Sequence, residues 1–257
     1  MTRRIEHVRI KDEKAYEAMY RAGQLLASLF EELRDFIRPA IATIAIDDYV
    51  VEYLKRHDLV SQTKGYHGYR HVSCISINDE VVHGVPSARR VMQEGDLVKV
   101  DICAAWNGYC ADMARCFFAG NSQNGAVRRL VEVAQKALDA GIQCAVPGGR
   151  LGTLSAAIQR VAESAGYSVV RDFAGHGIGA SMHEEPEVLN YGVAGEGLVI
   201  KPGMAFAIEP MLTAGSCEVI VERDRWTVRT VDHSIAAHIE DTVFVTEQGP
   251  VVITRAG

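Results

Sequence analysis

The chain has 257 residues, 48% hydrophobic and 23% charged, as is ordinary for a soluble globular protein. Its net charge of −6 excludes an overall basic field, so we expect no direct nucleic-acid role. There is no apolar run long enough for a membrane span and no apolar segment of the kind found in signal peptides. The six cysteines form no C-x-x-C pair, which disfavours a zinc ribbon or a thioredoxin-type site. Without a signal peptide or a membrane span, we expect a cytoplasmic protein with reduced thiols.

Helical periodicity comes first along the chain. Apolar residues recur every three or four positions over residues 12–38, and residues 47–57 predict a second helix with Asp47 as its N-cap. From residue 72 to 118 the pattern changes to short apolar runs separated by turn signals, among them Asn107-Gly108. These runs predict an antiparallel sheet with hairpins.

The same order then repeats. Residues 125–146 and 153–165 predict two more helices, the second followed by Gly166 as its C′ residue, and short strand-like runs fill the remainder. Residues 95–101 and 203–209 each lead from a glycine through a mostly apolar strand to an acid. We therefore expect one α+β domain over residues 1–257, with a pseudo-twofold repeat of helix-helix-antiparallel sheet halves at about 12–120 and 125–254.

Four acids interrupt runs that otherwise resemble buried strands: Asp101, Asp112, Glu209 and Glu240. Buried carboxylates need positive partners, for which Lys99 and Arg115 are the close candidates, unless each acid faces solvent. Asp101 and Asp112 are eleven residues apart, which suits adjacent antiparallel strands joined at Asn107-Gly108. A divalent metal between two such carboxylates would offset their repulsion.

Two histidines lie seven residues apart in the stretch GHGIGASMHEEP, residues 175–186. The flanking glycines let the backbone approach closely, which favours His176 as a metal ligand over a satisfied or exposed side chain. His183 is then expected near the metal without necessarily binding it. The pattern gives Glu184 and Glu185 no firm role, and we expect them to be exposed or outside the direct ligand set.

Together these motifs resemble those of type I methionine aminopeptidases of the bacterial kind, which have the pita-bread metallopeptidase fold. The resemblance spans about residues 12–254 and includes YHGY (66–69), C-I-S-I-N-x-x-x-x-H-G-x-P (74–86), GHGIG with HEEP, and AIEPM (207–211). It implies a hydrolase that removes the N-terminal methionine from nascent proteins and peptides when the second residue is small. It also implies a central dinuclear site for two divalent metal ions, which could be Co, Mn, Fe or Zn.

The resemblance assigns the metal ligands residue by residue. Asp101 and Asp112 are similar to the first two ligands, with Asp112 bridging both ions. His176 matches the single imidazole ligand, and Glu240 matches the second bridging carboxylate. Glu209 matches a ligand that also moves the proton of the attacking water.

The resemblance also implies the residues that contact substrate. His83 matches a histidine near the scissile bond, and His183 matches one that polarises the scissile carbonyl. The same comparison predicts that an apolar, polarisable pocket for methionine is lined or bordered by Tyr66, Tyr69, Cys74, Met182 and Trp226.

The chain departs from the family pattern in two regions. Thr63 stands where a cysteine often borders the pocket, and Arg70 stands where proline is usual. The last motif reads AHIEDT, with His238, Ile239 and Asp241 where the family more often has glutamine, an aromatic residue and histidine. The sequence IEDT is closer to proline-specific relatives of the same fold.

Two alternatives follow. One is an Xaa-Pro aminopeptidase or prolidase, although such relatives usually carry an extra N-terminal domain and the first helix here begins by residue 12. The other is a non-catalytic binding relative, although such proteins typically lose metal ligands and all five are present. Further expectations are a monomer and an association with the ribosome.

Overall fold

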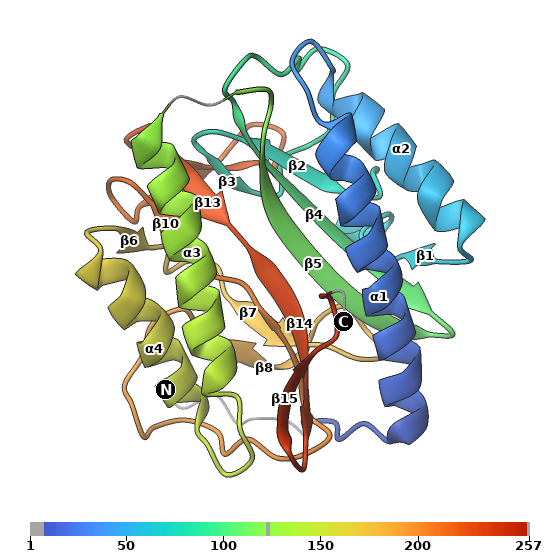
Figure 1. The fold of residues 1–257 in the computed structure, drawn as a ribbon, viewed down its shortest axis with the longest axis vertical. Coiled ribbons are helices and arrows are strands. Elements are labelled where there is room, and N and C mark those ends of the chain that lie inside the picture. Colours follow the sequence, from blue (N-terminus) through green and yellow to red (C-terminus); the bar gives the residue numbers. More distant parts are fainter. Residues whose placement is uncertain (1–7, 122–123, 256–257) are drawn as a thin grey trace.

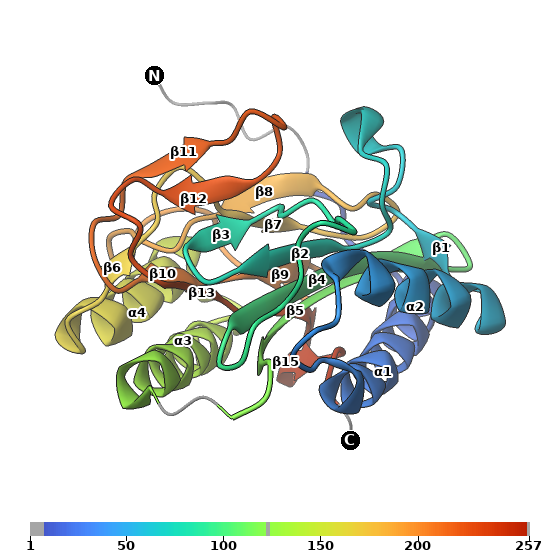
Figure 2. The ribbon, with the colours of Figure 1, turned by 90° about the horizontal axis from the view of Figure 1, so that it is seen from above.

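The computed structural model describes residues 8–121 and 124–255. Four long helices in these ranges cover one face of a nine-stranded sheet, as the two views of the ribbon show (Figures 1 and 2). They are α1 (Glu13–Phe36), α2 (Thr43–Arg56), α3 (Gly125–Gln143) and α4 (Leu151–Ser164). Within the described ranges, no helix is both long enough and apolar enough to cross a membrane.

The helices form where the apolar periodicity predicts them, with one error at the start of α2. The sequence predicts a helix over 47–57 capped by Asp47, but α2 begins four residues earlier, at Thr43. Asp47 is buried inside the helix, and its carboxylate accepts hydrogen bonds from the backbone N–H groups of Val72 and Ser73, both at 3.0 Å. The acid therefore anchors the chain ahead of the sheet rather than capping a helix.

The predicted hairpin is the longest pair of strands in the fold. β4 (Leu97–Trp106) and β5 (Tyr109–Phe118) are joined by Asn107 and Gly108, which have positive φ angles of 48° and 81°. Both conformations suit a tight hairpin turn. β1 (Val60–Ser61) and β2 (Cys74–Ile77) both pair with β4.

The second half continues the same sheet. β14 (Glu240–Thr246) pairs with β5 on one side and with β9 (Ala205–Ile208) on the other, so it joins the halves. The remaining strands of this sheet are β7 (Gly175–Gly177), β8 (Glu184–Val188) and β15 (Gly249–Val252). Two three-stranded sheets consist of β6 (Ser168–Val169), β10 (Met211–Thr213) and β13 (Ala236–His238), and of β3 (Glu80–Val82), β11 (Val219–Val221) and β12 (Val228–Thr230).

The internal repeat has a structural counterpart. Gly95 and Gly203 both adopt a left-handed conformation, with φ angles of 84° and 80°. Their backbone N–H groups donate to the carbonyls of Ala119 and Val245, at 2.7 and 2.8 Å. Each glycine therefore starts its strand in the same way, beside the end of a neighbouring strand, and the two acids that follow lie at matching places.

Candidate metal centre

Strand register places three of the four acids side by side. Asp101 on β4 lies opposite Ala114 on β5, and Glu240 on β14 lies opposite the same alanine from the other edge. Asp112 lies opposite Cys103, two residues from Ala114, and therefore on the same face of the sheet. The small side chain of Ala114 leaves space between these carboxylates.

The fourth acid and the first histidine come from the adjoining strands. His176 on β7 pairs with Ala207 on β9, and Glu209 follows two residues later on the same face. The Nε2 atom of His176 lies 3.6 Å from Oε1 of Glu209 and 4.0 Å from Oδ2 of Asp112. The imidazole of His176 therefore lies within the cluster of carboxylates.

Glycines on both sides of His176 permit this close approach. A Cβ atom on Gly175 would collide with the carbonyl oxygen of Ala207, and one on Gly177 would collide with that of Glu185. Larger residues would therefore push β7 away from both neighbouring strands. This packing agrees with the prediction that the glycines allow the backbone to approach its neighbours closely.

The cluster has the donors that a divalent ion requires. Two overlapping sets of three side chains each bring one donor atom within 4.8 Å of the others: Asp112, His176 and Glu240, and Glu209, His238 and Glu240. Among the described residues, Oε1 of Glu240 is buried with no hydrogen-bond partner. Carboxylate oxygens with few imidazoles suit ions such as Mn, Fe, Co or Zn, so these residues fit a metal site.

The two cations that the sequence offers as partners for these acids bind elsewhere. Nζ of Lys99 donates to the carbonyl oxygen of Asn78 at 2.7 Å. Arg115 pairs with Asp241, which is fully buried and also accepts from Nε of Arg255 at 2.7 Å. Neither candidate therefore pairs with the four carboxylates, and the buried Asp241 is neutralised by two arginines.

The pKa shifts of the clustered side chains agree with a site that binds cations. Burial raises the pKa of Asp112 to about 7 and that of Glu209 to about 8. Burial, with the charge of Asp112 as the next cause, raises the pKa values of Asp101 and Glu240 well above their ordinary range. Burial lowers the pKa of His176 to about 3, so its imidazole is neutral and free to act as a ligand.

A cavity of about 770 Å³ opens above the cluster. Its walls include all five predicted metal ligands and all seven predicted substrate residues: His83, His183, Tyr66, Tyr69, Cys74, Met182 and Trp226. The rings of Tyr69 and Trp226 meet edge to face with centroids 4.8 Å apart. The volume and the mixed aromatic and sulfur lining suit one apolar side chain with a short length of backbone.

The two predicted substrate histidines line the cavity from different segments of the chain. His183 is exposed, its Nδ1 lies 2.8 Å from the hydroxyl of Tyr66, and its ring centroid lies 4.3 Å from that of His176. His83 packs edge to face on Phe173 at 5.5 Å. Desolvation within the cavity lowers the pKa of His183 even though part of the residue is exposed, and burial lowers that of His83 to about 4, so both are neutral near pH 7.

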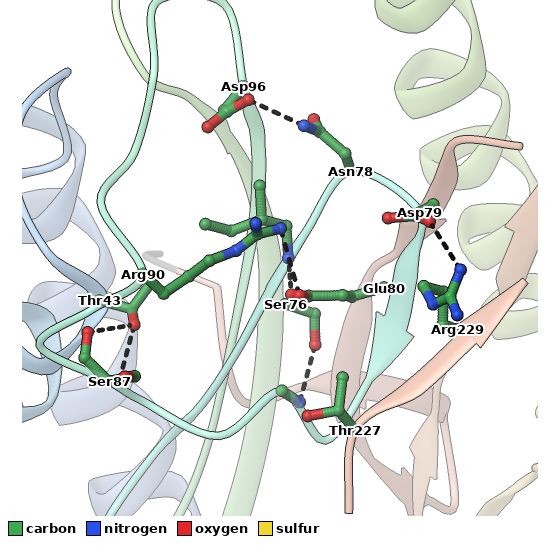
Figure 3. A network of polar contacts seen from close by, with 12 residues as sticks. Thr43, Ser76, Asn78, Asp79, Glu80, Ser87, Arg90, Asp96, Thr227 and Arg229 are labelled. Atoms are coloured by element: carbon green, nitrogen blue, oxygen red, sulfur yellow. Dashed lines mark hydrogen bonds and ion pairs between the residues drawn. The ribbon is translucent and has the colours of Figure 1, made fainter. Parts of the chain in front are cut away.

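A polar network surrounds the turn between β2 and β3 (Figure 3), a segment that leads to His83. His83 has a positive φ of 58°, an unfavourable conformation for a residue with a side chain. The N–H of Gly84 donates to Oγ of Ser76 at 3.0 Å, and the Asn78 amide donates to Asp96 at 2.8 Å. These bonds hold the turn after β2 and the residue after His83, and so restrict the position of the histidine.

Glu184 has a definite partner, which the sequence does not reveal. Its Oε2 lies 3.0 Å from Nζ of Lys11, and both side chains are less than a tenth exposed. The N–H of Lys11 donates to the carbonyl of Gly203 at 2.7 Å, and the N–H of Ser181 donates to Oε1 of Glu184. The pair thus ties the segment before α1 to the loop that carries His183.

Lys11→Met is expected to destabilise the protein by about 3 to 5 kcal/mol, because it leaves the Glu184 carboxylate buried without its cation. The double substitution Lys11→Met with Glu184→Leu should recover most of this loss. Urea unfolding measures both, with Arg34→Met as a control in the exposed pair with Glu31. Equal losses in the single and double variants would contradict a stabilising role for the pair.

Several cavity residues are absent from the sequence-based prediction. They come chiefly from residues 171–191, where β7 and β8 are too short to give a strand pattern: Arg171, Asp172, Phe173, Ala174, Leu189 and Tyr191. Thr63 also lines the cavity, whereas Arg70 is exposed and is not among the lining residues. The glycine-rich frame around His176 was the one signal for this region.

Comparison with known proteins supports the same interpretation. The profile of metallopeptidase family M24 matches residues 17–247. Methionine aminopeptidase A of Synechocystis is 39% identical over 96% of this chain and 97% of its own length, and methionine aminopeptidase 1 of Bacillus subtilis is 42% identical over 92% and 95%.

Solved structures extend the likeness to the fold. Methionine aminopeptidase from Thermotoga maritima superposes with a TM-score of 0.95 at 39% identity, covering 97% of this chain and 100% of that one. The Xaa-Pro dipeptidase of Bacillus anthracis has a TM-score of 0.77 at 23% identity, with only 62% of its length covered, so it shares the fold alone. The predicted α+β pita-bread fold is confirmed, and the chain belongs to metallopeptidase family M24.

Proposed function

We propose that this protein is a cytoplasmic methionine aminopeptidase of one catalytic domain. It removes the N-terminal methionine from nascent proteins and peptides when the second residue is small. The observation that carries the proposal is the convergence of Asp101, Asp112, His176, Glu209 and Glu240 at one cavity with an apolar, sulfur-containing wall. The named relatives, which match over nearly the whole chain, support the same activity.

The metal ligands in this proposal are the five residues predicted from the sequence. Asp112 and Glu240 would be shared between two ions, and the two side chains each offer an oxygen atom to the same group of donor atoms. Bound divalent ions would lower the pKa of water to near neutrality and polarise the substrate carbonyl. The donor set fits Mn, Fe, Co or Zn.

Glu209 is the proton carrier of the proposed reaction. It accepts the proton of the attacking water and returns a proton to the leaving amine. Its position at the edge of the cluster, beside His176 and facing the cavity, supports both roles.

The two histidines position and stabilise the scissile carbonyl. When Nδ1 of His183 accepts a hydrogen bond from the Tyr66 hydroxyl, its proton is on Nε2, which can donate to the carbonyl oxygen. His83, whose ring packs against Phe173, contacts the substrate near the scissile bond.

The wall residues explain a preference for methionine. Tyr69 and Trp226 provide flat apolar surfaces, and Met182 and Cys74 provide polarisable sulfur atoms. A thioether gains from contacts with both kinds of group. Thr63 adds a small polar boundary at the same cavity.

Release of methionine from a Met-Gly-Met peptide tests the proposal. Metal-stripped protein titrated anaerobically with Mn, Fe and Co is expected to gain activity, and His83→Ala is expected to lose most of it. An Ala-Pro peptide should not be cleaved. Cleavage of Ala-Pro would support a proline-specific peptidase, and no cleavage of either peptide would support a non-catalytic relative.

A further inference from the structure

A third histidine lies at the cluster, outside the predicted ligand set. His238 is only 1% exposed, and its Nε2 lies 3.2 Å from Oε2 of Glu209. We propose that His238 is a positioning residue that donates a hydrogen bond to Glu209 and holds this carboxylate in its working orientation. The inference rests on the proposed function in taking Glu209 as the proton carrier.

The strands bring the two side chains together. His238 is the last residue of β13 and pairs with Met211, the first residue of β10. Glu209 lies two residues before Met211, and the N–H of Ile239 bonds to the carbonyl of Pro210 at 3.4 Å. Backbone pairing therefore brings His238 and Glu209 close to each other.

The backbone of His238 is also anchored to the neighbouring strand β5. Its carbonyl oxygen accepts a hydrogen bond from the thiol of Cys116 on β5 at 3.4 Å. Because the ring is buried and its strand is anchored, Nε2 can offer its N–H at a constant position. Such preorganised groups orient metal-bound carboxylates in other metalloenzymes.

The carboxylate of Glu209 lies between two imidazoles, of which His238 makes the hydrogen bond. Its Oε1 lies 3.6 Å from Nε2 of His176, on the side of the predicted ligands, and its Oε2 faces His238. As a ligand Glu209 is ionised, so its oxygens accept and Nε2 of His238 donates. Fixing Oε2 sets the plane of the carboxylate and so directs Oε1 toward the ligand cluster.

A second role for His238, as a direct metal ligand, would fit the same interatomic distances. Glu209, His238 and Glu240 also satisfy the spacing of a metal-binding set, so a direct bond from His238 to an ion would place the atoms similarly. The hydrogen bond is the better assignment because it uses the contact that the structure contains, at a length within the ordinary range for such bonds. The experiment below separates these roles.

His238→Gln and His238→Leu form the test. Glutamine carries an N–H donor the same number of bonds from the backbone as Nε2 of histidine, but an amide nitrogen is a poor metal ligand. Leucine fills the space without a donor. Ile239→Val is the matched control, since Ile239 is a buried neighbour that packs in the core beneath α3 and α4.

The measurements are kcat and KM for Met-Gly-Met and the affinity of the metal-stripped proteins for Mn by calorimetry. His238→Leu should lower kcat and Mn affinity by about 10- to 100-fold, the effect typical of losing an outer hydrogen bond to a ligand. His238→Gln should restore both to within a few-fold of the unsubstituted protein, and KM should change little throughout. Ile239→Val should leave all three values near normal.

Two outcomes would overturn the inference. Equal losses in His238→Gln and His238→Leu would show that the imidazole itself binds the ion. Normal kcat and Mn affinity in His238→Leu would show that the contact has no function. Failure of the proposed function is recognised separately, because the unsubstituted protein would then bind Mn without releasing methionine.

Discussion

Glu209→Gln is expected to lower kcat for methionine release by roughly a hundred- to ten-thousandfold, the usual contribution of a positioned acid–base group. Glutamine keeps the size of the side chain and one oxygen, but it cannot accept the proton of the attacking water. The buried carboxyl has its pKa raised by burial to about 8 in the metal-free protein, so its environment already favours proton uptake. The protein should remain folded, because the substitution removes a buried charge.

The measurement is kcat at saturating Mn, together with the Mn content of the variant. Glu163→Gln, an exposed change on α4, is the control and should leave kcat unaltered. Loss of turnover with normal Mn content would assign Glu209 to proton transfer. More than about a tenth of normal kcat with the metal bound would contradict that role, given the size of ordinary acid–base contributions.

Local patterns were sufficient to predict much of the fold. Asn107-Gly108 between two apolar runs predicts the hairpin of β4 and β5. Because the two strands pair without a bulge, Asp101 and Asp112 lie on the same face of the hairpin. Apolar periodicity likewise locates the four helices. In each case the determining interactions lie within about a dozen residues of sequence, so the pattern and the structure agree.

Long-range contacts were not predictable in the same way. Asp47 resembles an N-cap because such residues commonly begin helices, yet its carboxylate is used by backbone groups 25 and 26 residues away. Arg115 resembles a partner for the site acids, yet it points to the buried Asp241. Both errors come from tertiary partners that override a local preference.

The candidate site shows the same division. The resemblance to methionine aminopeptidases supplied five candidate ligands, which all line one cavity in the structure, because the spacing of their motifs is distinctive. The contacts of His238 and of the Lys11–Glu184 pair involve residues 29 and 173 positions apart, which no motif connects. Such supporting residues became visible only in three dimensions.

A cluster of buried carboxylates must weaken the fold when no cation is present. Four acids share one face with no Lys or Arg paired to them among the described residues. The favourable packing of α1–α4 on the sheet offsets this cost. Metal binding should therefore stabilise the protein, and the size of the effect should depend on pH.

The metal-free protein is expected to lose stability as the pH rises from about 6.5 to about 8.5. The folded-state pKa values of Asp112 and Glu209, about 7 and about 8, are raised above those of the unfolded chain. The native state therefore keeps protons that the unfolded state has already released, and this stabilisation disappears as the pH passes through the folded-state values. Each such carboxyl contributes a fall of up to about 1.4 kcal/mol per pH unit below its folded-state pKa, and the fall levels off above that value.

Below about pH 6.5 the buried histidines make the stability of the protein rise with pH, which is opposite to the effect of the carboxyls. Burial lowers the pKa values of His176 and His238 to about 3 and about 4, so the unfolded chain binds protons there more readily than the native protein does. Their contribution to stability therefore rises with pH from about 4 to 6.5 and then becomes constant. The window above 6.5 isolates the carboxylates, which makes it the informative range.

Urea unfolding of chelator-treated protein at pH 6.5, 7.5 and 8.5 measures this decline, and Mn-loaded protein provides the comparison. In the metal-free protein, Asp112→Asn should reduce the fall in the free energy of unfolding with pH and raise its value at pH 8.5, because one buried charge is gone. The exposed Asp48→Asn should have neither effect. Mn should stabilise most at pH 8.5, where its ligands have released their protons. A metal-free stability that is constant or rises above pH 6.5 would mean that the four carboxylates find another cation or solvent in the absence of metal.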